Sequence, residues 1–301
     1  MQVIRGTAEV RQLVRALQRQ DRTLGMVPTM GFLHAGHANL IEAAVAESDE
    51  AVVTIFVNPT QFGPQEDLSR YPRDLERDLN LCQARGVRWV FVPDTDELYP
   101  RGTTGGWTQV CVPETLTRGL CGAWRPGHFI GVATVVAKLF ALWQPQRAYF
   151  GLKDFQQTAV LRAMVQDLLL PVELRLLPTV READGLALSS RNVYLSVEER
   201  QQSLVLVQAL QAGWLASRGP DATPEGILAA ARRVLEQEPG WSTQYLELVD
   251  ADSLEPIETM NRPGVLALAG FIGRTRLIDN VFLGGPAPLD RPAEQAAGSL
   301  A

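Results

Sequence analysis

Hydrophobic residues recur along this chain with two spacings, one typical of helices and one typical of buried strands. The apolar positions of residues 7–20 follow helical spacing and predict a helix. The segment AVVTIFV at 51–57 is continuously apolar and rich in β-branched residues, as in strands buried on both faces of a parallel sheet. The first 60 residues therefore predict a mixture of helices and parallel strands.

The same alternation continues to about residue 180. It predicts strands at 24–28, 89–93, 108–112 (TQVCV), 148–151 and 172–178, and helices at about 38–47, 75–85, 131–143 and 155–168. Strands that alternate with helices indicate an α/β fold, here a Rossmann-like, doubly wound parallel sheet. In such folds ligands bind beyond the carboxyl ends of the strands.

A different pattern begins near residue 184. Two helical stretches, 197–217 and 223–237, precede YLELVD, GVLALAGFIG and TRLIDNVFL, which predict antiparallel strands. We expect a Rossmann-like domain over 1–183 and a smaller α+β C-terminal domain over 184–285. The Pro- and Ala-rich residues 286–301 are expected to be a disordered tail.

Composition narrows the functional classes. The 301 residues carry a formal net charge of -6, which disfavours a general nucleic-acid binder because phosphate affinity needs a basic face. Three cysteines without CxxC spacing indicate neither a disulfide framework nor a structural zinc site. No apolar segment is long enough for a membrane span, so we expect a cytoplasmic protein.

MGFLHAGH, residues 30–37, is the first candidate for chemistry. His34 and His37 lie where a strand should meet a helix, a place that favours anions. Two imidazoles there could bind triphosphate oxygens. A zinc protease motif would need histidines four residues apart with an adjacent glutamate, which HAGH lacks, and a purely structural pair stays open.

Further polar clusters follow other predicted strands. They are NPTQF with Asn58 and Gln61, GLKDFQQ with Lys153, Asp154 and Gln157, and LSSRN with Ser189, Ser190 and Arg191. Each also has a purely structural interpretation: an Asn-Pro turn, a solvated lysine, and a helix-capping turn, respectively. Together at one sheet edge they favour a nucleoside triphosphate site, although neither GxxxxGK[ST] nor GxGxxG is present. Local chemistry assigns no role to His128 of RPGHF.

These motifs resemble one known family across residues 1–285. VPTMGFLHAGH, TIFVNPTQF, RYPRDLERD, RPGHFIGVATVVAKLF, FGLKDFQQ, PTVREADGLALSSRNVYLS and RLIDN appear in the order found in the pantoate–β-alanine ligases, which share the HxGH loop with other nucleotidyltransferases. The resemblance implies condensation of pantoate with β-alanine through a pantoyl-adenylate, with ATP as substrate, Mg²⁺ as cofactor, and release of AMP and pyrophosphate.

The resemblance also implies residue roles. Residues 1–183 would bind nucleotide and pantoate, and a homodimer would form through the N-terminal domain. Separately, we expect residues 184–285 to move as a lid, because Gly185 and the SSR segment lie at the junction and an adenylate hydrolyses unless water is excluded. His37 would be the proton donor, and His34, Lys153, Ser189, Ser190 and Arg191 would join it in catalysis; the magnesium ligands stay unassigned. The substrate contacts would be Gln61 and Gln157, and the position of Asn58 at the same sheet edge adds it as a third candidate. The ATP contacts would be Met30, Gly31, Phe32, Leu33, His34, Ala35, Gly36, His37, Gly151, Leu152, Lys153, Asp154, Val180, Leu188, Ser189, Ser190 and Arg191.

Three alternatives compete with this interpretation. A simple nucleotidyltransferase would share the histidine loop but would not pass an adenylate to an amine, and the glutamines of NPTQF and KDFQQ argue against it. An RNA-binding, synthetase-like protein conflicts with the acidic charge balance. A catalytically silent scaffold would have no reason to keep all the motif residues together.

Overall fold

The computed structural model describes residues 1–104, 106–262 and 264–285. The chain forms two compact units, each described separately below. Unit 1 contains residues 1–113, 125–152 and 160–177, and unit 2 contains residues 114–124, 153–159 and those from 178 onward. Residues 286–301, expected to be a disordered tail, lie outside the described residues. The boundary at residue 183 stays a prediction.

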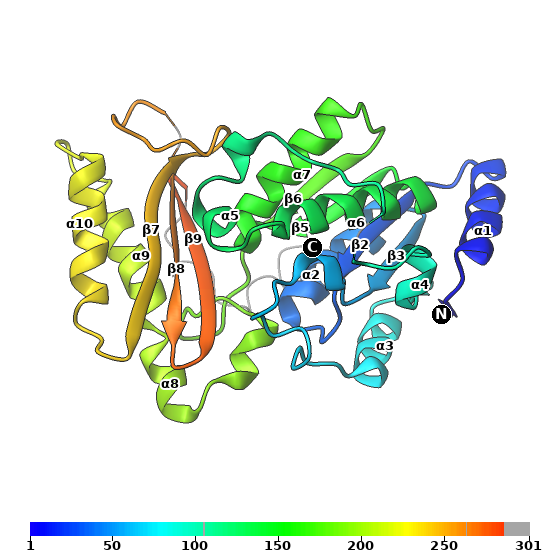
Figure 1. Ribbon diagram of the computed structural model, residues 1–301, viewed down its shortest axis with the longest axis horizontal. Helices are drawn as coiled ribbons and strands as arrows, with labels where there is room; N and C mark the ends of the chain where they lie inside the picture. Colours follow the sequence, from blue (N-terminus) through cyan, green and yellow to red (C-terminus); the bar gives the residue numbers. More distant parts are fainter. Residues whose placement is uncertain (105, 263, 286–301) are drawn as a thin grey trace. The chain divides into compact units, whose positions relative to one another are not determined.

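Unit 1 is built on a six-stranded sheet in which every neighbouring pair is parallel (Figure 1). The strand order is β1-β4-β3-β2-β5-β6. Their bounds are β1 (Gln2–Ile4), β2 (Leu24–Thr29), β3 (Glu50–Ile55), β4 (Trp89–Phe91), β5 (Arg147–Gly151) and β6 (Glu173–Leu177). This topology confirms the predicted Rossmann-like sheet.

Helices cover both faces of this sheet, which explains why its central strands are continuously apolar. On one face Val53 and Val90 pack with Ile41 of α2 (Ala35–Glu47) in a buried cluster. Phe91 is next to Val90 along β4, so its side chain points to the opposite face. There its ring meets Trp143 of α6 (His128–Trp143) edge-on, with ring centroids 5.7 Å apart. The remaining helices of unit 1 are α1 (Thr7–Arg19), α3 (Leu75–Ala84), α4 (Thr95–Leu98) and the end of α7 (Phe155–Asp167).

The chain order reverses between β2 and β5, because β3 and β4 lie on one side of β2 while β5 and β6 lie on the other. Ligands of open α/β sheets bind at such a switch point, outside the carboxyl ends of the strands. The segment 30–37 follows β2 directly, and Gly151 ends β5. The fold thus places segment 30–37 and Gly151 at the switch point.

Unit 2 contains an antiparallel sheet in the order β7-β8-β9, as expected for a smaller α+β domain. Its strands are β7 (Trp241–Asp250), β8 (Gly264–Ile272) and β9 (Thr275–Leu283). Leu266 and Leu268 of β8 are fully buried in a cluster with Leu210 and Ile227, which come from the helices of the unit. Those helices are α5 (Leu120–Trp124), α8 (Val197–Gln202), α9 (Val205–Ala216), α10 (Pro224–Leu235) and the start of α7.

Several predicted elements need correction. TQVCV at 108–112 is not a strand: its residues are exposed or half-buried, and the N–H of Val110 donates to the Thr134 hydroxyl of α6 at 2.9 Å instead of to a strand. The predicted helix 197–217 is two helices, α8 and α9. They are separated at Ser203, whose fully buried hydroxyl donates to the Arg200 carbonyl.

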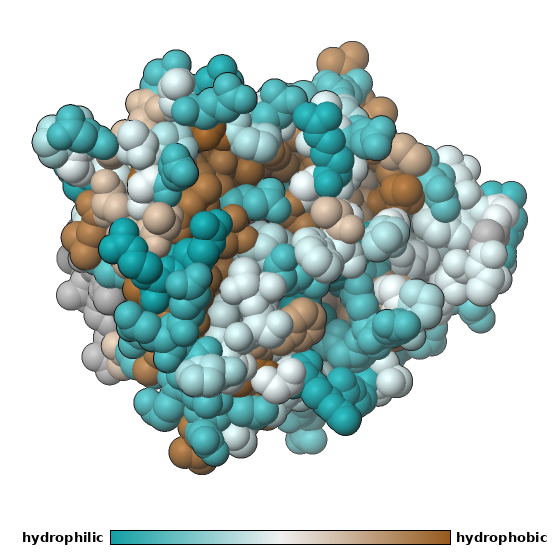
Figure 2. Space-filling model, turned by 60° about the vertical axis from the view of Figure 1, so that its left-hand side comes forward, coloured by the Kyte–Doolittle hydropathy of each residue, from teal (hydrophilic) through white to brown (hydrophobic). Residues whose placement is uncertain are grey.

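The surface and the helices carry two further observations. On the face drawn in Figure 2, hydrophilic residues predominate and hydrophobic ones show mostly between them. Among the helices of residues 1–104, 106–262 and 264–285, none has both the length and the apolar character that crossing a membrane requires.

Candidate active site

The two histidines of HAGH occupy the start of a helix rather than a loop. α2 begins at Ala35, three residues earlier than the sequence predicted, and His34 is its N-cap. The Nδ1 atom of His34 accepts a hydrogen bond from the N–H of Gly36 at 3.1 Å. The Nδ1 atom of His37 accepts one from the N–H of His34 at 3.3 Å, so the rings pack with centroids 4.1 Å apart.

These capping bonds fix the tautomer of each neutral imidazole. A nitrogen that accepts a hydrogen bond carries no proton, so the proton of each ring sits on Nε2. His34 and His37 therefore present N–H donors at the positive end of the α2 dipole, which is the arrangement that an anion requires. A metal ion would instead need a lone pair on the coordinating nitrogen, so the geometry favours the anion interpretation over the metal one.

A buried carboxylate holds the loop that leads into this helix. Asp78 of α3 is 1% exposed, and its two oxygens accept the N–H groups of Phe32 and Leu33, each at 2.7 Å. Gly31 has a φ of +80°, and a Cβ there would lie 3.0 Å from an Asp78 oxygen. Burial raises the pKa of Asp78 above its usual value, although the two N–H donors lower it. The carboxylate thus sets the course of residues 31–33.

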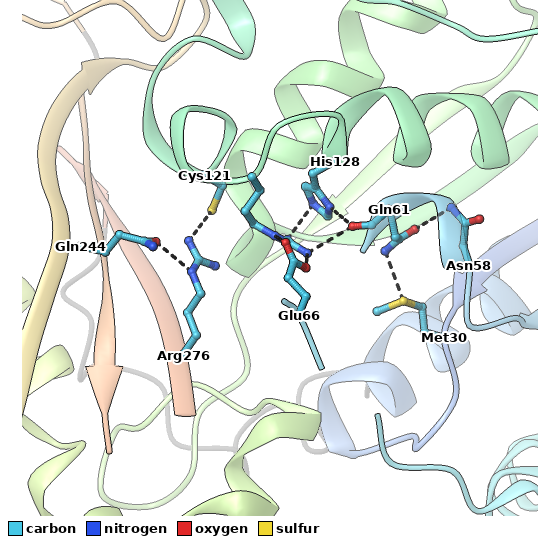
Figure 3. Close-up of polar contacts among 9 residues, drawn as sticks. Met30, Asn58, Gln61, Glu66, Cys121, His128, Gln244 and Arg276 are labelled. Atoms are coloured by element: carbon cyan, nitrogen blue, oxygen red, sulfur yellow. Dashed lines mark hydrogen bonds and ion pairs between the residues drawn. The ribbon is translucent and has the colours of Figure 1, made fainter. Parts of the chain in front are cut away.

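Asn58 and Gln61 follow β3. Asn58 is the N-cap of the 3₁₀-helix η1 (Pro59–Gln61), and Gln61 is the last residue of that helix. Asn58 is 1% exposed and donates from Nδ2 to the Gln61 side-chain oxygen at 3.1 Å and to the Gly131 carbonyl at 3.2 Å. The Gln61 amide nitrogen donates to the sulfur of Met30 at 3.2 Å (Figure 3). Sulfur is a weak acceptor, so a substrate oxygen can replace it at little cost.

In unit 2, the segment 153–159 continues the chain from β5. Lys153 and Lys138 are the only lysines of the chain, among 28 basic residues. The Lys153 carbonyl accepts a hydrogen bond from the Asn280 side chain of β9 at 2.9 Å, and its ammonium lies 3.8 Å from a carboxylate oxygen of the exposed Asp154. Gln156 is buried and binds the carbonyls of Leu116 and Gly119, so it is structural.

A buried ion pair supports the serine-arginine segment of unit 2. Arg181 and Asp279 are 6% and 0% exposed, and the second nitrogen of the guanidinium donates to Asp279 at 3.1 Å. Arg181 also donates to the carbonyl of Gly185, a turn residue with a φ of +93°. Losing one partner of such a pair would leave a buried charge. Asp279 therefore anchors the hairpin that returns the chain toward Leu188.

Ser189 performs the capping role that the sequence left open. Its hydroxyl accepts the N–H of Arg191 at the start of η4 (Ser190–Tyr194). Ser190 is buried, and Arg191 is half-buried.

The structure divides the predicted site residues between its two units. Those in unit 1 are 30–37, Asn58, Gln61, Gly151 and Leu152, and those in unit 2 are Lys153, Asp154, Gln157, Val180 and 188–191. Unit 1 brings Met30, Asn58 and Gln61 into direct contact. Within the described ranges, no group of three or more His, Cys, Asp or Glu side chains could hold a metal ion.

Sequence reasoning missed Asp78, Asp279 and Asn280 as supports of the site. Asp78 is on an amphipathic helix, 46 residues after Phe32, and nothing in its neighbourhood marks it as buried. Asp279 and Asn280 are part of RLIDN, a motif that the family resemblance includes without giving it a role. Only the RYPRDLERD and RLIDN motifs could have drawn attention to them.

The parallel sheet with its switch point and the capped histidine pair form a candidate anion-binding site of an α/β protein, and comparison with known proteins narrows the class. The family model described as pantoate-beta-alanine ligase matches residues 2–282. The chain therefore belongs to the pantoate-β-alanine ligase family.

Relatives named after this activity are about 50% identical to the chain over the aligned residues. Pantothenate synthetase of Moorella thermoacetica is 50% identical over 289 residues, covering 94% of this chain and 99% of that protein. A bifunctional pantoate ligase/cytidylate kinase of Synechococcus sp. (strain JA-3-3Ab) is 51% identical over 98% of this chain. The chain spans only 54% of the length of that bifunctional relative.

Solved structures agree with the family assignment. Pantothenate synthetase from Thermus thermophilus superposes with a TM-score of 0.87 at 48% identity, covering 93% of this chain and 99% of the other. A pantoate-beta-alanine ligase from Francisella tularensis, complexed with beta-gamma ATP and beta-alanine, has a TM-score of 0.78 at 30% identity and covers 95% of this chain and 99% of the other.

The histidine tautomers can be measured directly because the chain has three histidines. We expect imidazole ¹⁵N spectra at about pH 8, where ordinary imidazoles are neutral, to show Nε2–H for His34 and His37. His128 is expected to show Nδ1–H, since its Nδ1 lies 2.8 Å from the Gln61 carbonyl, which can only accept. Single-histidine substitutions assign the signals. An Nδ1–H signal from His34 or His37 would contradict the capping arrangement.

Proposed function

We propose that this chain is an ATP-dependent pantoate–β-alanine ligase that forms pantothenate through a pantoyl-adenylate and releases AMP and pyrophosphate. The observation that carries the proposal is the start of α2, where the Nδ1 atoms of His34 and His37 accept backbone N–H groups and leave Nε2–H as the donor of each ring, in a chain that belongs to this family. The structure of the Francisella relative is complexed with beta-gamma ATP and beta-alanine, which supports ATP and β-alanine as substrates here.

The first chemical step makes a leaving group. An amine cannot displace oxide from a carboxylate, so a pantoate oxygen attacks the α-phosphorus of ATP and pyrophosphate departs. We assign the ATP contacts to residues 30–37, 151–154, Val180 and 188–191. His34 and His37 donate to the phosphate oxygens, with His37 as proton donor, while Lys153 and Arg191 offset the charge that grows at the phosphorus. Ser189 and Ser190 support this segment.

The second step needs proximity more than further activation. The free amine of β-alanine attacks the acyl carbon of the adenylate, the bond to the AMP oxygen breaks, and the amine proton is lost to solvent or buffer. We assign Gln61 to both pantoate and β-alanine, and Gln157 to pantoate. Asn58, which holds the Gln61 side chain, is assigned to the same pocket. No covalent enzyme intermediate is required.

Further parts of the proposal rest on the family resemblance. Magnesium enters with ATP as its counter-ion rather than in a cage of protein ligands, since Mg²⁺ is usually held through substrate phosphates. We also propose a cytoplasmic homodimer formed through the N-terminal domain. Residues 184–285 are proposed to close as a lid, because an adenylate hydrolyses unless water is excluded.

The proposed activity predicts a strict dependence on both acceptor substrates. Purified protein with MgATP, pantoate and β-alanine should release AMP and pyrophosphate at equal rates, measured by coupled enzymatic assays. Omitting β-alanine should leave at most one turnover, and omitting pantoate should abolish release. Sustained AMP formation with either substrate alone would contradict the ligase assignment, and pyrophosphate release without amide product would favour the simple nucleotidyltransferase.

Substitution of the phosphate-binding groups should separate catalysis from binding. His37→Ala and Lys153→Ala are expected to slow pantoate-dependent adenylate formation on the order of 100-fold, because each removes a donor to the transition-state charge. Pantoate affinity, measured by calorimetry, should change much less. Equal losses in the rate and in pantoate affinity would indicate a folding or binding role instead.

A further inference from the structure

His128 is the one histidine to which the proposed reaction gives no role, yet it lies in an organised network of unit 1. It is 9% exposed and belongs to the first turn of α6, which begins three residues earlier than the sequence predicted. Its Nδ1 lies 2.8 Å from the backbone carbonyl of Gln61 (Figure 3). Its Nε2 lies 2.9 Å from a guanidinium nitrogen of Arg125. Two neighbours thus determine the position and tautomer of this ring.

Hydrogen-bond chemistry fixes the direction of both contacts. A carbonyl can only accept, so Nδ1 carries the proton and donates it to Gln61, which leaves a lone pair on Nε2 for Arg125. The guanidinium of Arg125 also donates to Glu66, with Nε to Oε1 at 2.9 Å, and a further nitrogen reaches the Gln61 carbonyl at 3.4 Å. Because the ion pair with Glu66 neutralises Arg125, the guanidinium is held within this network.

The backbone of Gln61 needs such support. It ends η1, a 3₁₀-helix of three residues, and one such turn is weak by itself. α6 approaches this turn so closely that a Cβ on Gly131 would lie 2.4 Å from the Thr60 carbonyl oxygen. The Gln61 side chain is held from the other direction by Asn58. Its amide orientation therefore depends on contacts at both the backbone and the side chain.

We propose that His128 and Arg125 are positioning residues for Gln61, holding its backbone carbonyl so that its amide keeps the orientation that both small substrates require. The inference rests on the proposed function, in which Gln61 contacts pantoate and β-alanine. Neither His128 nor Arg125 touches the reacting atoms in this scheme. Their loss should therefore weaken both small substrates together while leaving ATP unaffected.

Three substitutions of His128 separate the hydrogen bonds from the bulk of the ring. His128→Asn keeps a donor attached to Cγ where Nδ1 was, His128→Gln keeps an amide one bond farther out, and His128→Leu keeps volume without polarity. KM for pantoate, β-alanine and ATP, and kcat, are measured for each variant and for the wild type. Urea unfolding checks that each variant is folded.

We expect His128→Leu and His128→Gln to raise KM for pantoate and for β-alanine about tenfold, with KM for ATP within about twofold, since a buried carbonyl loses its donor. His128→Asn should restore both KM values to within about threefold of the wild type. A purely structural role would instead change all three KM values, or none, in proportion to stability. Unchanged KM values in a folded His128→Leu variant overturn the inference, as does failure of His128→Asn to rescue.

Arg125→Lys provides the second test if the His128 variants do not fold. Lysine keeps the ion pair with Glu66 but lacks the planar fork that reaches His128 and Gln61, so the same two KM values should rise. The matched control is Arg85→Lys, because Arg85 pairs with Glu42 at 3.1 Å on the surface of the same unit. Equal effects of the two lysine variants overturn the inference. Wild-type protein that lacks the ligase activity overturns the proposed function itself, and is recognised before any variant is compared.

Discussion

The buried carboxylate of Asp78 is the contact on which the histidine pair depends. Its two oxygens accept consecutive N–H groups of Phe32 and Leu33, and this fixes the path of the chain immediately before α2. Only then can His34 cap the helix and His37 accept the His34 N–H. Burial raises the pKa of Asp78 because it removes water from the charged carboxylate. The two N–H donors favour the charged form and offset part of that rise.

Other residues proposed to contact substrates are also held in place by hydrogen bonds from neighbouring residues. Gln61 is held by Asn58 through its side chain and by His128 through its backbone, and the carbonyl of Lys153 is held by Asn280. In each case the residue proposed to contact a substrate is oriented by a hydrogen bond from a second residue. Such support is what keeps a site within the tolerance that positioning demands, since small displacements are costly for reactions that rely on proximity.

Much of the architecture could be predicted from hydrophobic periodicity. Continuous apolar segments such as 51–57 mark buried parallel strands, and the change of pattern near residue 184 marks the antiparallel part. The strand predicted at TQVCV was wrong because a β-rich composition does not supply a neighbouring strand. The N–H of Val110 donates instead to the hydroxyl of Thr134 in α6. α2 and α6 were predicted to start late, because a histidine N-cap and a left-handed Gly127 are not ordinary helix-start signals. The role of Asp78 could not be predicted from local pattern, since its partners Phe32 and Leu33 are distant in sequence and only the RYPRDLERD motif pointed to it.

The central claim is that the carboxylate of pantoate attacks the α-phosphorus of ATP bound at the start of α2. Pantoate labelled with ¹⁸O in both carboxylate oxygens tests it most directly, with the products analysed by mass spectrometry after a single turnover. The account predicts that one labelled oxygen appears in AMP and the other in the amide carbonyl of the product, with none in pyrophosphate. Unlabelled AMP, or label in released phosphate together with ADP, would contradict it.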